Sequence, residues 1–132
     1  MSYIPLSGVE VPAKRVIGMI LEQVSDRSRA QLASGVVAYA LGFDLTDMLG
    51  QARGRRHHCL GRQLSMYLTY TAFEMSLSRC AYAFGRDRST VAHACHTVEA
   101  RRDDAAFDNW VDGLESSLKT LAPYAPDGKA AL

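Results

Sequence analysis

A chain of 132 residues is the size of one compact domain, and 48% of apolar residues can bury a single core without disulfides or metal. The balance of 15 basic against 14 acidic residues leaves a net charge of +1, which gives no indication of a polyanionic partner. The longest apolar run, near residues 32–43, is broken by glycine and serine and falls short of the roughly 20 residues of a membrane span, so we expect no contact with a membrane.

The N-terminal third predicts an extended arm followed by two helices. Residues 1–12 carry prolines and a glycine with little periodicity, which is typical of an arm. From Ala13 to about Val24 the apolar positions follow a period of 3.6 residues, which indicates a first helix. Ser25 and Asp26 are suited to cap a second helix, which we expect to end at Gly42.

The middle of the chain predicts a short helix, a loop and a longer helix. Asp44 precedes one helical turn over residues 45–49. Residues 51–61 contain glycines, arginines and a pair of histidines without an apolar stripe, so we expect a solvated loop. Residues 62–75 regain a helical stripe.

Two capped helices and a final amphipathic helix follow. Ser76 is a candidate N-cap for a helix over residues 77–84, Gly85 is the expected turn residue, and Asp87 caps a helix that runs to about Arg102. The last helix covers about residues 104–121, before a proline-containing tail. The sequence therefore predicts an all-α domain of about six helices containing a helix-turn-helix.

Charge is unevenly distributed. Residues 53–62 hold four arginines and no acid, whereas residues 103–115 hold five acids and no base. One basic and one acidic surface in a small domain suggest that only one face meets an anion. We expect an N-terminal arm and helical extension over residues 1–35, a DNA-binding segment over residues 36–102, and an acidic helix and tail over residues 103–132.

The helices over residues 77–84 and 88–102, joined by a short turn with a glycine, match the spacing of a helix-turn-helix, whose second helix enters the DNA major groove. On that second helix we expect Val91, Ala94, Cys95 and Val98 to be buried. The opposite face then carries donors, acceptors and a small apolar residue, which are the groups that read base edges: Arg88, Ser89, Ala92, His93 and His96.

Residues 61–95, GRQLSMYLTYTAFEMSLSRCAYAFGRDRSTVAHAC, resemble the C-terminal DNA-binding domain of the bacterial replication initiator DnaA, a Trp-repressor-like helix-turn-helix. The resemblance covers about residues 36–102. Its most specific part is the order Arg-Gln, Ser-Leu, Ala-Phe-Gly and Arg-Asp-x-Ser/Thr-Thr-Val-x-His-Ala-Cys. The chain is therefore expected to be a stand-alone protein similar to that domain.

The resemblance implies roles for named residues. The family's base-contacting stretch corresponds to Asp87, Arg88, Ser89 and Thr90, with Arg88 in the place of a histidine. A guanidinium there favours guanine, because it can pair with both major-groove acceptors. The family usually has one more residue before Arg86, so the turn is shorter here and the helix angle is expected to shift.

The resemblance also implies contacts with the DNA backbone and the minor groove. The basic loop corresponds to the family's minor-groove arm, and the start of the helix at residue 77 to a phosphate contact that a helix N-terminus provides. A family lysine at the backbone is replaced by Tyr70. We assign the backbone or minor groove to six residues, namely Arg53, Arg55, Arg56, Arg62, Ser78 and Arg86, and base reading also to His93.

The nucleotide-binding part of the initiator, with its glycine-rich loop, has no counterpart in these 132 residues. We expect no cofactor, no nucleotide and no catalysis, since no catalytic arrangement is recognisable. The function indicated is that of a small transcriptional regulator or a replication-associated DNA-binding protein. The alternative from another class is an adaptor that uses this fold, with its acidic last helix, to hold a protein partner.

Three further features allow more than one interpretation. His57, His58 and Cys59 with His93, Cys95 and His96 are poorly arranged for zinc, so no metal is expected, and Cys80 and Cys95 fit a core. An odd cysteine number without an export signal favours a reducing cytoplasm. The expected binding of DNA implies association with the nucleoid. The apolar stripe from Phe107 to Leu121 is expected to dock on its own domain, or else to form a homodimer contact.

Overall fold

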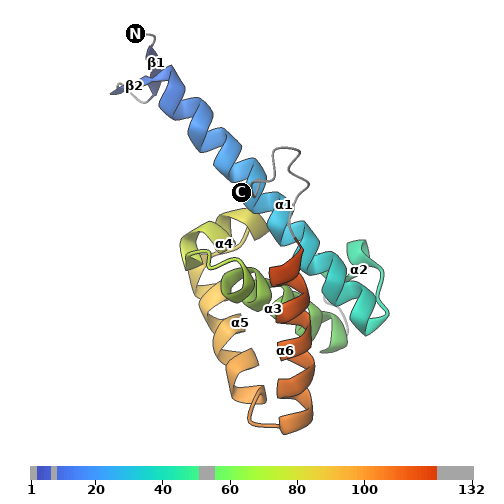
Figure 1. Ribbon diagram of the computed structural model, residues 1–132. Helices are drawn as coiled ribbons and strands as arrows, with labels where there is room; N and C mark the ends of the chain where they lie inside the picture. Colours follow the sequence, from blue (N-terminus) through green and yellow to red (C-terminus); the bar gives the residue numbers. More distant parts are fainter. Residues whose placement is uncertain (1–2, 7–8, 51–55, 122–132) are drawn as a thin grey trace.

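The computed structural model describes residues 3–6, 9–50 and 56–121, and within them the chain is almost entirely helical (Figure 1). The all-α prediction is confirmed. The elements in chain order are β1 (Tyr3–Leu6), β2 (Val9–Pro12), α1 (Ala13–Leu41), α2 (Leu45–Leu49), α3 (Arg56–Ala72), α4 (Leu77–Phe84), α5 (Arg88–Arg101) and α6 (Ala105–Thr120). None of the described helices is long and apolar enough to cross a bilayer.

The expected N-terminal arm contains a small β-hairpin. β1 and β2 pair antiparallel, with Ile4 opposite Val11 and Pro5 opposite Glu10. The hairpin lies at the start of α1, at the end of the molecule farthest from the other helices (Figure 1). The sequence did not predict it, because four-residue strands are too short to show a clear alternation.

The helix α1 is continuous over 29 residues, so the prediction of two helices separated at Ser25 and Asp26 is wrong. Asp26 does not cap a helix, because its carboxylate is engaged in tertiary contacts and is only 4% exposed. Arg79 of α4 donates to both carboxylate oxygens, from Nε at 2.9 Å and from a terminal nitrogen at 2.6 Å. Arg29, one turn further along α1, adds a third bond of 3.0 Å.

The helix α3 begins at Arg56, so the prediction that residues 51–61 form a loop is wrong for residues 56–61. Gly61 was one reason to predict a loop, but in the structure this glycine lies within α3 and allows close packing. A Cβ atom at Gly61 would lie 2.5 Å from the sulfur of Met48, so a larger residue here would require the buried Met48 side chain to shift. At its other end α3 stops at Ala72, before the expected Met75.

Two adjoining apolar clusters form the core. The larger joins α1, α3, α5 and α6 around Val37, Leu64, Leu68 and Val98. The smaller holds α4 and α5 against α3, with Met66, Met75, Cys80, Ala81, Val91 and Ala94. The face of α6 docks on its own domain as predicted, because Val111 and Leu118 are buried and its aromatic residues pack against the larger cluster.

Replacing Asp26 by alanine is expected to lower the free energy of unfolding by about 1–3 kcal/mol, since it leaves Arg79 without its bidentate partner. The loss of unfolding free energy is expected to be smaller than for a fully buried ion pair, because the Arg79 side chain is 40% exposed. Urea denaturation measures the change. Glu22→Ala is the matched control on the same helix, since Glu22 is exposed and only 3.6 Å from Arg79; equal losses in both variants would contradict the assignment.

Candidate nucleic-acid interface

The turn between α4 and α5 is set by local backbone chemistry. Ser76 caps α4 by accepting a bond from the Arg79 amide at 3.2 Å, as predicted. At the other end Gly85 has a φ of 64°, a left-handed conformation that favours glycine. The amide of Arg86 reaches back to the Ala81 carbonyl at 2.9 Å and that of Gly85 to the Tyr82 carbonyl at 3.2 Å, which is the Schellman pattern. The two helices are therefore joined by a tight turn.

Asp87 occupies the N-cap position of α5, but its side chain makes no capping hydrogen bond. The prediction of a side-chain cap is wrong. The backbone carbonyl of Asp87 instead accepts from the amides of Thr90 at 3.0 Å and Val91 at 3.2 Å. The exposed carboxylate of Asp87 thus makes no capping hydrogen bond to the first turn of the helix.

The two sides of α5 differ sharply in exposure. Val91, Ala94 and Val98 are buried, and Cys95 is half-buried between the two clusters. All five residues expected on the opposite face are exposed, namely Arg88, Ser89, Ala92, His93 and His96, and Thr90 is exposed as well. The helix therefore presents the polar face that the sequence predicted.

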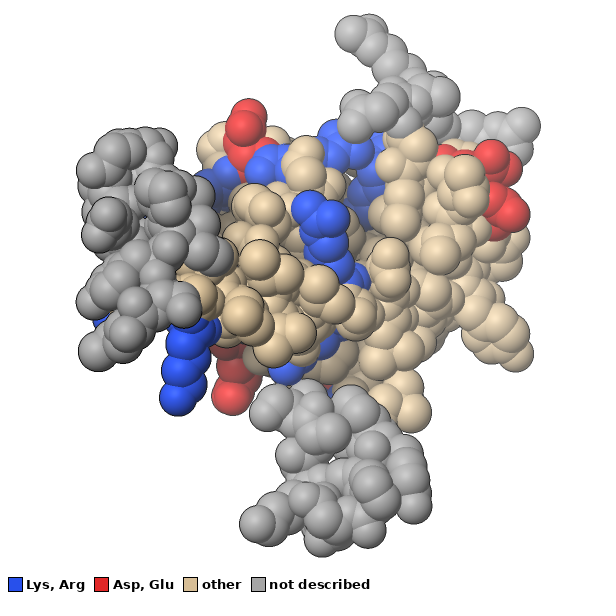
Figure 2. Space-filling view, turned by 90° about the horizontal axis from the view of Figure 1, so that it is seen from above, with Lys and Arg blue, Asp and Glu red and all other residues tan. Residues whose placement is uncertain are grey.

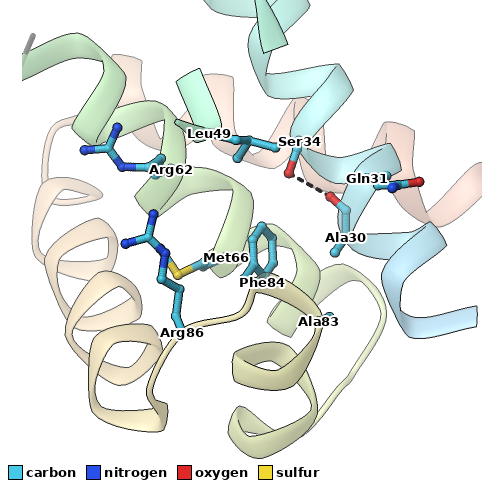
Figure 3. Close-up of a pocket in the computed structure, with 9 residues that line it drawn as sticks. All are labelled: Ala30, Gln31, Ser34, Leu49, Arg62, Met66, Ala83, Phe84 and Arg86. Carbon is cyan, nitrogen blue, oxygen red and sulfur yellow. Dashed lines mark hydrogen bonds between the residues drawn. The ribbon is translucent and has the colours of Figure 1, made fainter. Parts of the chain in front are cut away.

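Two of the expected backbone residues, Arg62 of α3 and Arg86 of the turn, lie together. Both line a pocket of about 200 Å³ between α1, α3 and α4. Their guanidinium groups lie on the same side of that pocket, while Phe84 and Leu49 face its interior (Figure 3). Arg62 also donates to the Met48 carbonyl at 3.1 Å, which holds this side chain beside α2. A basic pair therefore flanks the start of α5.

The remaining expected residues lie in different settings. Arg56 is exposed in the first turn of α3 and Ser78 is exposed in the first turn of α4, while Tyr70 is exposed on α3. Arg53 and Arg55 lie outside the described residues. Seen from above, basic side chains appear as separate patches in a largely uncharged surface (Figure 2). The positive charge on this face is thus divided among small patches and does not form one continuous basic surface.

The C-terminal end of α5 is held by a network that the sequence analysis did not identify. Glu99 accepts a 2.5 Å bond from the Tyr67 hydroxyl, and Arg102 donates to that hydroxyl at 2.9 Å. Arg102 also pairs with Asp108 at 2.6 Å and with Asp112. Burial and the bond to Glu99 raise the pKa of Tyr67 to about 12, so its hydroxyl remains protonated at neutral pH. The spacing of Asp108 and Asp112 by four residues, which places both on one face of a helix, was the sequence feature that could have indicated this network.

The cysteines have the predicted packing roles. Cys80 is fully buried, and burial raises the pKa of its thiol to about 12. Burial likewise raises the pKa of Cys95 to about 11. Metal binding needs the thiolate, which these environments disfavour. Among the described residues no group of three or more His, Cys, Asp and Glu side chains is placed to hold a metal ion.

The fold and this interface define a domain of the helix-turn-helix class. The sequence profile described as the bacterial DnaA protein helix-turn-helix matches residues 32–98. The chain belongs to this family.

Curated relatives are chromosomal replication initiator proteins DnaA. The protein from Bifidobacterium animalis subsp. lactis is 39% identical over 83 residues, which cover 61% of this chain and 14% of the relative. The protein from Flavobacterium psychrophilum is 30% identical over 108 residues, which cover 80% and 22% respectively. The chain therefore spans less than a quarter of the length of either relative.

Solved structures give the same assignment. A crystal structure of a DNA replication initiation factor matches with a TM-score of 0.67 and 27% identity, over 77% of this chain and 32% of that one. The replication initiator DnaA bound to AMPPCP and single-stranded DNA matches with a TM-score of 0.66 and 25% identity, over 86% and 33%. The matched part contains a helix-turn-helix rather than a catalytic domain.

The thiols provide a test of the packing around α5. At pH 8 we expect a thiol reagent such as DTNB to modify the exposed Cys59 rapidly, and Cys80 and Cys95 only when the protein unfolds. Because the folded pKa values of Cys80 and Cys95 both lie above the ordinary 9.0, the contribution of these thiols to stability is complete below pH 9 and is lost as the pH rises toward 11 and 12. Rapid modification of all three thiols in the folded protein would contradict this packing.

Proposed function

We propose that this chain binds double-stranded DNA sequence-specifically through α4 and α5, as a small bacterial transcriptional regulator or a replication-associated DNA-binding protein of the cytoplasm and nucleoid. The observation that carries the proposal is the exposed, polar N-terminal half of α5 on a rigidly packed helix-turn-helix. A helix presented in this way fits the major groove, where each base pair shows a distinct pattern of donors and acceptors.

Base reading is assigned to Asp87, Arg88, Ser89, Thr90 and His93. Arg88 begins α5 and is exposed, so its guanidinium can reach the two acceptors of a guanine. The carboxylate of Asp87 makes no capping bond and is therefore available to accept from a cytosine amino group. These two side chains together favour a G·C pair near the start of the helix.

Backbone contacts are assigned to the two ends of this interface. Arg62 and Arg86 provide positive charge beside the start of α5. The first turn of α4, with Ser78, offers backbone amides and the positive end of a helix dipole to a phosphate. Arg53, Arg55 and Arg56 are proposed to contact the backbone or the minor groove from the segment that leads into α3.

The rival function is a protein-interaction adaptor that uses the acidic last helix. Most acidic residues of that region already form hydrogen bonds or ion pairs with other residues of this chain. This favours DNA binding over an acidic surface that recruits a partner. Asp104 caps α6, Asp108 and Asp112 pair with Arg102, and Glu115 pairs with Lys119 at 3.0 Å. A homodimer through α6 is likewise disfavoured, because its apolar face packs on the larger cluster. No nucleotide, cofactor or enzymatic role is proposed.

A gel shift on random duplex DNA at low salt distinguishes the two functions. A DNA-binding domain with several phosphate contacts retards nonspecific duplex at low salt and loses affinity as salt rises. An adaptor without DNA affinity would give no retardation at any protein concentration. Selection of bound sites from random duplex then identifies the target sequence.

Replacing Arg56 by alanine is expected to weaken binding to all duplexes similarly and to lower the slope of log K against log salt by about one unit or less, the effect of losing one phosphate contact. Arg55→Ala is expected to do the same. Fluorescence anisotropy at several salt concentrations measures the slope. Arg15→Ala is the matched control, because Arg15 is an exposed arginine of α1 remote from the interface. An unchanged slope in both the Arg55 and the Arg56 variant would remove this segment from the interface.

Replacing Arg88 by alanine is expected to change specificity rather than stability. Losing a bidentate guanine contact costs about 1–3 kcal/mol of discrimination, while removing an exposed helical arginine changes the unfolding free energy by about 0.5 kcal/mol or less. Arg88→Ala should keep its Tm and its low-salt affinity but accept other bases at one position of the selected site. If the site stays the same at every position, Arg88 does not read a base.

A further inference from the structure

The N-terminal half of α1 carries an apolar stripe that the domain does not use. Ile17, Ile20, Leu21 and Val24 are 57%, 52%, 63% and 57% exposed, although they follow helical spacing. This half of α1 extends away from the body formed by the other helices (Figure 1). Four large aliphatic side chains on one exposed helical face indicate an interaction surface.

The stripe is separate from the side of α1 that packs on the domain. The residues of α1 that are buried include Asp26, Ala30, Ala33 and Val37. At 3.6 residues per turn, the mean direction of these four residues differs from that of the stripe by nearly half a turn. The stripe is therefore a second face of the helix and not an extension of the core.

The order of residues along the stripe is self-complementary. When two copies of α1 lie antiparallel about an axis between Gly18 and Met19, residue 13 lies level with residue 24, residue 16 with residue 21, and residue 17 with residue 20. All six positions are apolar, being Ala13, Val16, Ile17, Ile20, Leu21 and Val24. A two-fold contact requires exactly such a surface, in which each patch meets its own copy.

The charges on the rest of this segment favour a protein surface over a lipid surface. Lys14 and Arg15 are followed on the same helix by Glu22, and all three are exposed. Helices that bind anionic membranes carry a densely basic polar face, which this mixture lacks. At 100° per residue, Arg15 and Glu22 lie on the opposite side of the helix from the stripe, and Lys14 lies at the edge of the stripe, where its ammonium group can stay in solvent.

We propose that this chain forms a two-fold homodimer through the stripe of α1, with the two helices antiparallel. The stripe is less than four helical turns long, so we expect a contact at the small and weak end of protein interfaces, with a dissociation constant of about a micromolar or higher. The proposal is independent of DNA binding, because self-association is measured without DNA.

Sedimentation equilibrium of the full chain between about 5 and 300 µM tests the association, since a weak dimer dissociates on dilution through micromolar concentrations. We expect a monomer-dimer equilibrium, and Leu21→Glu and Ile17→Glu are each expected to weaken it at least about tenfold. Tyr39→Glu is the matched control, because Tyr39 is the most exposed large residue of α1 and lies outside the stripe. Circular dichroism verifies that each variant is folded. A monomer at every concentration, or a dimer unaffected by both stripe variants, overturns the proposal.

Cysteine crosslinking tests the antiparallel orientation in a Cys59→Ser background. A mixture of tagged Ile17→Cys and untagged Ile20→Cys is expected to give a mixed disulfide, because these positions lie level with each other. Val24→Cys alone is expected to give none, since its two copies would be about 16 Å apart along the helix, beyond the reach of a disulfide. A Val24 disulfide without the mixed product overturns the orientation. Cosedimentation of a monomeric chain with vesicles of phosphatidylserine and phosphatidylcholine would instead identify a lipid surface as the occupant.

Discussion

The burial of one side of α5 is the constraint on which the interface depends. Val91, Ala94 and Val98 have no exposed surface or almost none, and rotating the helix would bring its polar side chains into an apolar environment. The exposed direction of Arg88 and His93 follows from this packing rather than from contacts of their own. The Schellman turn at Gly85 then sets where the helix begins.

The buried carboxylate of Asp26 connects the helix-turn-helix to α1. Its bonds to Arg79 join the middle of α1 to α4, which is the first helix of the helix-turn-helix. Because the pair lies close to where α1 leaves the body, it fixes the direction in which the exposed half of the helix projects. The interface and the apolar stripe are thus held on one rigid framework.

The sequence predicted the parts of the structure that local rules determine. The bounds of α4 and α6, the turn at Gly85 and the two faces of α5 follow from capping residues and helical periodicity, and the structure confirms them. Two of the errors arose where tertiary contacts override those rules. Asp26 has the local features of a cap but pairs with a residue 53 positions away, and Gly61 has those of a loop but admits Met48.

The acidic helix α6 is compatible with DNA binding because of where its charge lies. Arg102, just beyond the end of α5, forms ion pairs with both Asp108 and Asp112 and so offsets part of their negative charge. The 14 residues of α5 place Arg88 about 20 Å from that network along the helix axis. This separation is about twice the Debye length of roughly 8–10 Å at physiological salt, so the remaining negative charge has little effect on phosphates near Arg88. The helix α6 can therefore complete the core without repelling a phosphate bound at the N-terminal end of α5.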